Sequence, residues 1–200
     1  AFYQKIAQEA RLRQRKVHTH CMETVYQKQS AYHVWGKSNI RHLEDIGVLG
    51  PWLILAHMVW VEGEDMDLLR DRQVGVVHNP SSNLRLRSGI APVDQMLAHG
   101  ISLGIGLDGF GLDDDQDYLR ELRMAWTLSK KPRASSELIS AADILSAGTS
   151  GGAKVSFSPE TKLGKLAPGY LADLLLVDDD QLQGVWRSPG VPAAEVLLQR

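Results

Sequence analysis

Three short apolar runs, each leading into a polar residue, constrain the fold of this chain more than any other feature. The runs span residues 53–57, 74–78 and 101–107. Amphipathic stretches with helical periodicity separate them. Successive β/α units of a parallel barrel have this pattern, and such a barrel carries its chemistry at the carboxyl ends of its strands. We therefore predict an α/β fold that gathers His57, His78 and Asp108 at one edge of the sheet.

A fourth unit precedes these three. Residues 17–21 read as a strand that contains His18 and His20, and Glu23 follows where the strand leads into a loop. Residues two apart on a strand face the same way, so both histidines project to one side. A neutral imidazole and a carboxylate on neighbouring strand ends can each donate one bond to a divalent ion, which makes His20 and Asp108 candidate metal ligands.

Five segments of the chain, in order and correctly spaced, resemble the amidohydrolase superfamily. The closest resemblance is to its branch of cytosine and guanine deaminases and triazine hydrolases. The segments are THCMET (19–24), LAHMVW (55–60), VVHNPSSNLRLRSGIAPV (76–93), GIGLDG (104–109) and GTSGGAKV…LGKLAPGYLADLLLVD (148–178). Each motif alone is weak, but together they cover nearly the whole chain.

The resemblance and the length together predict an incomplete barrel. A complete eight-fold barrel takes roughly 250 residues, whereas this chain has 200 including a tail. Residues 1–147 are expected to form about strands five to eight of a (β/α)8 TIM-like barrel with their helices. Residues 148–200 are expected to form a C-terminal segment with part of a small β-sandwich domain. The family's strand-one His-x-His would then be missing, so we expect a piece of a longer protein; the alternative is a half-barrel that a partner completes.

Local patterns locate the individual elements. The segment before 38–46 reads as a loop, and short strands are expected to end at 174–177. The remaining expectations are helices over 1–16, 38–46, 63–72, 91–99, 115–130 and 136–147, and strands over 17–21, 53–57, 74–78 and 101–107.

The resemblance implies a site for one divalent metal ion, zinc or iron. The strand-five histidine and strand-eight aspartate of the family correspond to His20 and Asp108, and the aspartate also takes the proton of the attacking water. The strand-six histidine, here His57, contacts that water or the leaving centre, and contacts the metal in some members. Without the resemblance, His20 could be a buried histidine bonded to the backbone, and Asp108 could be a turn residue before Gly109.

Glu23 stands three residues after His20, which matches the family's H-x-x-E spacing. The resemblance implies that this glutamate protonates a ring nitrogen of the substrate, a role suited to a carboxyl group whose pKa is raised by burial. An ordinary solvated glutamate is the alternative. His18 is expected one layer deeper in the barrel. His78 and Asn79 are expected to shape the substrate pocket, although the same residues suit a tight turn.

These residues predict a metal-dependent hydrolytic deaminase in which water displaces ammonia from an amino-substituted N-heterocycle of purine, pterin or pyrimidine type. The alternatives are a triazine-type chloro- or aminohydrolase and a catalytically incomplete half-barrel. A net charge of −2 gives no electrostatic basis for binding nucleic acid, and no apolar run approaches the roughly 20 residues that span a bilayer. The single cysteine, Cys21, suits a reducing cytoplasm. The resemblance implies a homo-oligomer.

Overall fold

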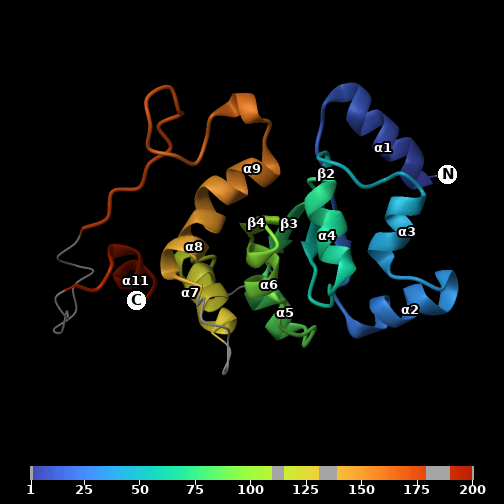
Figure 1. The fold of residues 1–200 in the computed structure, drawn as a ribbon. Helices are drawn as coiled ribbons and strands as arrows, with labels where there is room; N and C mark the ends of the chain where they lie inside the picture. Colours follow the sequence, from blue (N-terminus) through green and yellow to red (C-terminus); the bar gives the residue numbers. More distant parts are fainter. Residues whose placement is uncertain (1, 110–114, 131–138, 179–189, 200) are drawn as a thin grey trace.

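The computed structural model describes residues 2–109, 115–130, 139–178 and 190–199. Four parallel strands form one sheet in the order β1-β2-β3-β4, so neighbours along the chain are also neighbours in the sheet (Figure 1). The strands are β1 (Val17–Cys21), β2 (Leu53–His57), β3 (Gly75–His78) and β4 (Ser102–Ile105). Helical crossovers join them, as parallel pairing requires.

Helices precede, connect and follow the strands. Figure 1 shows α1 to α3 at one end of the molecule, α4 to α6 in its middle and α7 to α9 towards the other end. The helices are α1 (Phe2–Arg13), α2 (Val25–Trp35), α3 (Asn39–Asp45), α4 (Glu64–Asp71), α5 (Pro80–Arg85), α6 (Val93–Ala98), α7 (Tyr118–Ser129), α8 (Ala141–Ser146), the π-helix η1 (Ala147–Gly151), α9 (Gly152–Ser156), the 3-10 turn η2 (Pro159–Thr161) and α11 (Ala193–Leu198).

The two faces of the sheet are packed differently. Leu55, Val76 and Leu103 are aligned across the three strands β2 to β4 and belong to the main hydrophobic core with α4, whose Met66 and Leu69 are fully buried. Because side chains alternate along a strand, Gly75 and Gly104 lie on the opposite face. There α9 approaches closely: a Cβ added at Gly75 would lie 2.8 Å from Val155 Cγ1.

Within residues 1–147, two of the described helices lie where the sequence patterns did not predict them. The predicted loop before residue 38 is wrong, because it contains α2, which begins after Thr24 and ends at Gly36 with φ 66°. Only Ala31 of α2 is buried, so the helix has no apolar stripe to reveal it. The second is α5, which begins at Pro80, where the missing N–H of proline is not needed.

The predicted strands of a β-sandwich are not formed in the described part of the C-terminal segment. No strand follows β4 within 139–178 and 190–199, and the side chains of Leu174, Leu175 and Leu176 are exposed. A strand needs a paired neighbour to satisfy its backbone groups, and this stretch has none in the described chain. Helical structure continues past residue 147 through η1 and α9, which packs on β3 and β4. The division into two domains at that residue stays a prediction.

We expect opposite results from adjacent alanine substitutions at the start of α9. Gly151→Ala would place a Cβ 2.4 Å from the Leu103 carbonyl oxygen, so the backbone must shift and stability should fall by about 1–3 kcal/mol. Gly152→Ala would meet nothing nearer than 3.6 Å and should gain up to about 1 kcal/mol from helix propensity. Urea unfolding of both variants measures the difference. Equal stabilities would contradict the close contact between η1 and β4.

Candidate active site

A pocket of about 430 Å³ lies at the carboxyl ends of the strands. Its lining residues come from all four strands or the turns that follow them: His18, Thr19, His20, Ala56, Val77, Asn79, Gly106, Asp108 and Gly109. The pocket thus brings together His20, Asp108 and Asn79 from the predicted site. His18 also lines it, beside His20, as strand alternation predicts for residues two apart.

Unusual backbone conformations turn the strand ends towards this pocket. His57 has φ 73° and Asp108 has φ 68°, in the left-handed region that non-glycine residues rarely adopt. Regular alternation would place His57 on the same face as Leu55, whereas its ring stacks on His20 at a centroid distance of 5.3 Å. Strained residues of this kind cluster at functional sites. The backbone of these two residues therefore supports their assignment to the site.

His57 is the centre of the polar cluster. Its side chain is 1% exposed, and its Nε2 lies 3.9 Å from Glu23 Oε2 and 3.9 Å from Asp108 Oδ2. Its Nδ1 lies 2.9 Å from Asn83 Oδ1. An amide oxygen only accepts hydrogen bonds, so Nδ1 donates to it and Nε2 faces the two carboxylates. Three electron-pair donors that face one another favour a cation or a hydrogen-bonded water between them.

Hydroxyl groups hold both carboxylates. Ser82 Oγ donates a hydrogen bond of 2.6 Å to Asp108 Oδ2, and Ser88 Oγ donates a longer one of 3.4 Å to Glu23 Oε1. The backbone N–H of Glu23 donates to Gln27 Oε1 at 2.8 Å, which links Glu23 to the first turn of α2. Such hydrogen bonds fix the direction in which each carboxylate points.

Helix α5 supplies several of these contacts from consecutive residues. Ser81 donates from both its backbone N–H and its hydroxyl to the buried Glu121 of α7, at 3.0 Å each. Ser82 then reaches Asp108 and Asn83 reaches His57. Ser82 and Asn83 belong to the motif of residues 76–93, but the sequence patterns gave neither residue a role. The available signal was their position directly after a strand end.

His78 and Asn79, predicted to bind substrate, occupy different places. The side chain of Asn79 lines the pocket, and its buried Oδ1 has no hydrogen-bond partner in the described chain. His78 is 1% exposed and lies behind Asn83, whose Nδ2 is 3.5 Å from His78 Nδ1. Burial, with a smaller effect of His57, lowers the pKa of His78 to about 3, so its ring stays neutral. A role of His78 towards substrate stays a prediction.

The donor set fits part of a metal site. His20, His57 and Asp108 offer imidazole and carboxylate groups, which bind zinc and iron. Within the described residues, however, no group of three or more His, Cys, Asp or Glu side chains is arranged to hold an ion. The predicted ligand set of His20, Asp108 and His57 therefore stays a prediction, and further ligands would have to come from outside these residues.

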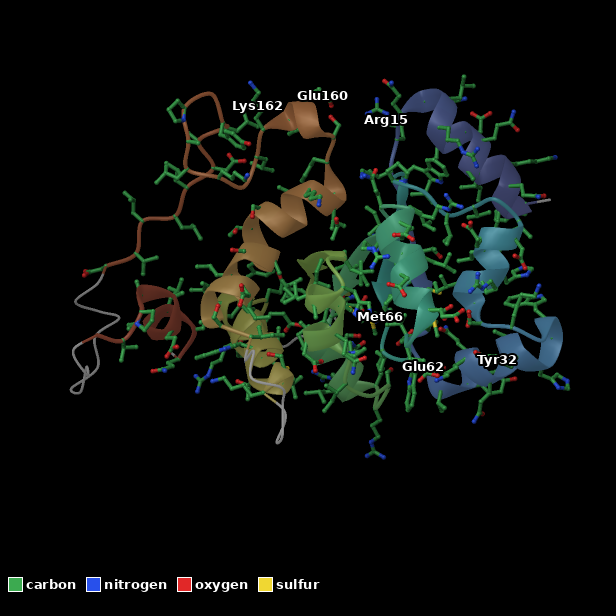
Figure 2. All side chains as sticks on the ribbon, in the orientation of Figure 1. Arg15, Tyr32, Glu62, Met66, Glu160 and Lys162 are labelled. Atoms are coloured by element: carbon green, nitrogen blue, oxygen red, sulfur yellow. The ribbon has the colours of Figure 1, made fainter. Side chains whose placement is uncertain are left out.

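A second pocket, of about 380 Å³, is separate from this cluster. Tyr32 and Glu62 lie on its wall between α2 and the start of α4 (Figure 2). Several polar residues of its lining pair with one another: Lys28 with Glu62 at 2.5 Å, Arg41 with Glu64 at 2.9 Å, and Ser38 with the buried Asp65 at 2.6 Å. None of the predicted site residues lines it.

Comparison with known proteins decides the family. The family model described as "Amidohydrolase family" matches residues 1–196. The chain belongs to the amidohydrolase family. The resemblance predicted from the motifs is confirmed.

Two curated relatives that are similar to this chain are deaminases. A 5'-deoxyadenosine deaminase of Methanosarcina acetivorans is 36% identical over 177 residues, which are 88% of this chain and 40% of the relative. A 5-methylthioadenosine/S-adenosylhomocysteine deaminase of Syntrophomonas wolfei is 35% identical over 89% of this chain and 41% of its own length. The chain therefore spans about two fifths of the curated relatives it matches.

Solved amidohydrolase structures match the fold almost completely. A zinc-bound adenosine deaminase from Xanthomonas campestris has a TM-score of 0.88 and 29% identity, covering 98% of this chain and 44% of the other. An atrazine chlorohydrolase from Arthrobacter aurescens complexed with zinc has a TM-score of 0.84 and 28% identity, covering 98% and 42%. With the four parallel strands, these matches confirm the predicted C-terminal half of a barrel. None of the described helices has the length and apolar character needed to cross a membrane.

Proposed function

We propose that the protein carrying this chain is a metal-dependent deaminase that hydrolyses the exocyclic amino group of an aminopurine nucleoside. The observation that carries the proposal is the convergence of Glu23 and Asp108 on Nε2 of the buried His57, each at 3.9 Å. The names of the relatives, which refer to deoxyadenosine, methylthioadenosine and adenosine, support this substrate class within the broader group of amino-substituted N-heterocycles.

We assign one divalent metal ion to the site, zinc before iron, because the matching solved structures contain zinc. His20, His57 and Asp108 would contribute ligands from this chain. A divalent ion in such a site supplies an activated water, because it lowers the pKa of water towards neutrality. The proton transfers of the reaction belong to side chains of this chain.

Each carboxylate then has a separate proton to move. Asp108, held by Ser82, accepts at a carboxylate oxygen the proton of the water that adds to the ring carbon bearing the amino group. Glu23, only partly buried, donates a proton to the adjacent ring nitrogen. The single lone pair of His57 Nε2 either orients the water or serves as a third metal ligand, and cannot do both. Asp108 then passes the proton it took from water to the amino group, the carbon–nitrogen bond breaks, and ammonia leaves. The ring carbon keeps the oxygen as a carbonyl, and the proton of the added hydroxyl returns to Glu23.

A triazine-type hydrolase is the second candidate, because the atrazine chlorohydrolase matches this fold over 98% of the chain. The same residues would then displace chloride or an alkylamine from the ring. A catalytically incomplete half-barrel is the third candidate. A cytoplasmic location, supported by the single buried thiol of Cys21, and a homo-oligomeric state are further parts of the proposal.

Reconstitution distinguishes these candidates. The chain is assayed alone and after co-expression with the part of the Methanosarcina acetivorans deaminase that precedes the matched region. In the positive control, the matched region of that deaminase replaces this chain and is co-expressed with the same preceding part. We expect the reconstituted enzyme to bind metal and to release ammonia from 5'-deoxyadenosine, and Asp108→Asn to abolish that release. Chloride release from atrazine without ammonia release would favour the triazine hydrolase. If the control pair is active and the pair that contains this chain is not, this chain is a catalytically incomplete half-barrel.

A further inference from the structure

The amide of Asn83 lies between two buried imidazole rings. Its Oδ1 is 2.9 Å from His57 Nδ1 and its Nδ2 is 3.5 Å from His78 Nδ1. All three side chains are almost completely buried, each with 1% exposure. This contact connects a residue of the candidate site to a histidine that the proposed reaction does not use.

The two ends of an amide impose opposite requirements on the two rings. Oδ1 only accepts, so the neighbouring Nδ1 of His57 must donate; Nδ2 only donates, so the Nδ1 of His78 must accept. The amide oxygen therefore requires a proton on Nδ1 of His57. The neutral ring of His78 has one proton and keeps it on Nε2. Reversing the amide would put the proton of His57 on Nε2, between Glu23 and Asp108.

We propose that Asn83 is a positioning residue that selects the tautomer of His57 and thereby keeps the Nε2 lone pair directed at the space between Glu23 and Asp108. His78 stabilises this orientation of the amide, because its Nδ1 accepts from Nδ2. With its proton on Nε2, His57 could neither accept a hydrogen bond nor donate an electron pair at that position. The effect of this tautomer on catalysis rests on the proposed function. The assignment of the tautomer to His57 rests only on the hydrogen bonds of Asn83.

The surroundings of α5 hold Asn83 in place. The helix is anchored to α7 through two hydrogen bonds from Ser81 to the buried Glu121. The intervening Ser82 contacts Asp108 at 2.6 Å. One short helix therefore positions an acceptor carboxylate and a histidine ring together, and a shift of the helix would disturb both.

The tautomers can be read directly by NMR. In the chain labelled with ¹⁵N-histidine, long-range ¹H–¹⁵N correlations show which ring nitrogen carries the proton, and the His57→Gln and His78→Gln variants assign the signals. We expect the proton on Nδ1 in His57 and on Nε2 in His78. A proton on Nε2 of His57 in the unsubstituted chain would overturn the proposal without any variant.

Two substitutions separate the two ends of the amide. Asn83→Asp keeps an oxygen for His57 but replaces the donor facing His78, so His78 should move its proton to Nδ1 while His57 is unchanged. Asn83→Leu removes both partners, and His57 should then show a mixture of tautomers. Ser129→Ala, which alters another buried polar group whose hydroxyl bonds within α7, should change neither ring. A proton that stays on Nε2 of His78 in Asn83→Asp, or a His57 that changes there, would refute the proposal even if Asn83→Leu does not fold.

Activity provides the second readout. In the reconstituted enzyme, Asn83→Leu should lower kcat or metal affinity by about 10–100-fold, the usual effect of losing a group that orients a ligand. If the tautomers behave as expected but no reconstituted pair releases ammonia, the proposed function fails while the positioning role stands. If ammonia is released and the tautomers do not respond to Asn83, the positioning role fails alone.

Discussion

Glu23→Gln should lower kcat of the reconstituted enzyme by about 10²–10⁴-fold, the usual contribution of a general acid, while KM changes little. Glutamine keeps the shape of the side chain and can still accept from Ser88, but it cannot deliver a proton to the ring nitrogen. Steady-state release of ammonia from 5'-deoxyadenosine measures the effect. The loss belongs to the chemical step, because the carboxyl proton reaches the ring nitrogen only as water adds to the ring.

Glu62→Gln provides a matched control for the same chemical change. Glu62 is exposed, pairs with Lys28 and lines the separate pocket between α2 and α4, so its substitution should leave kcat unchanged. If Glu23→Gln behaves like this control, Glu23 is a solvated glutamate and the proton donor lies elsewhere. That result would also remove the main reason to prefer a deaminase over a triazine hydrolase.

The stability of the chain should fall in acid because His78 is buried in its neutral form. Its folded pKa is about 3, below the ordinary value of 6.5, so between these pH values the unfolded chain binds one more proton than the folded chain. The contribution of neutral His78 to the free energy of unfolding is therefore fully present above pH 6.5 and is lost as the pH falls towards 3. Relative to a variant without this group, the free energy of unfolding should drop by about 1.4 kcal/mol per pH unit.

His78→Leu supplies that reference. Urea unfolding of both proteins at several pH values gives two curves, and only their difference reports His78, because the other titrating groups are shared. The unsubstituted chain should lose stability relative to His78→Leu as the pH falls. A difference that does not depend on pH would show that the ring of His78 is hydrated or already protonated when folded.

Several features of the fold and the site could be predicted from local patterns. Short apolar runs closed by His57 or Asp108 cannot form surface helices, so buried parallel strands follow directly. Helix α2 could not be predicted in this way, because it covers little of the core. The exposed run at Leu174–Leu176 shows the converse limit: its pattern is that of a strand, but an unpaired strand does not form.

By itself, the sequence determined the order of the four strands, the family through its motifs, and the carboxyl ends as the place where His20, His57 and Asp108 gather. These depend on periodicity and spacing, which are local properties. Only the tertiary structure decided that His57 turns inward through a left-handed backbone, that Ser82 and Asn83 hold the site, and that His78 lies behind it. Hydrogen bonds between residues 26 positions apart, such as His57 to Asn83, depend on how the chain packs and have no signature in local sequence.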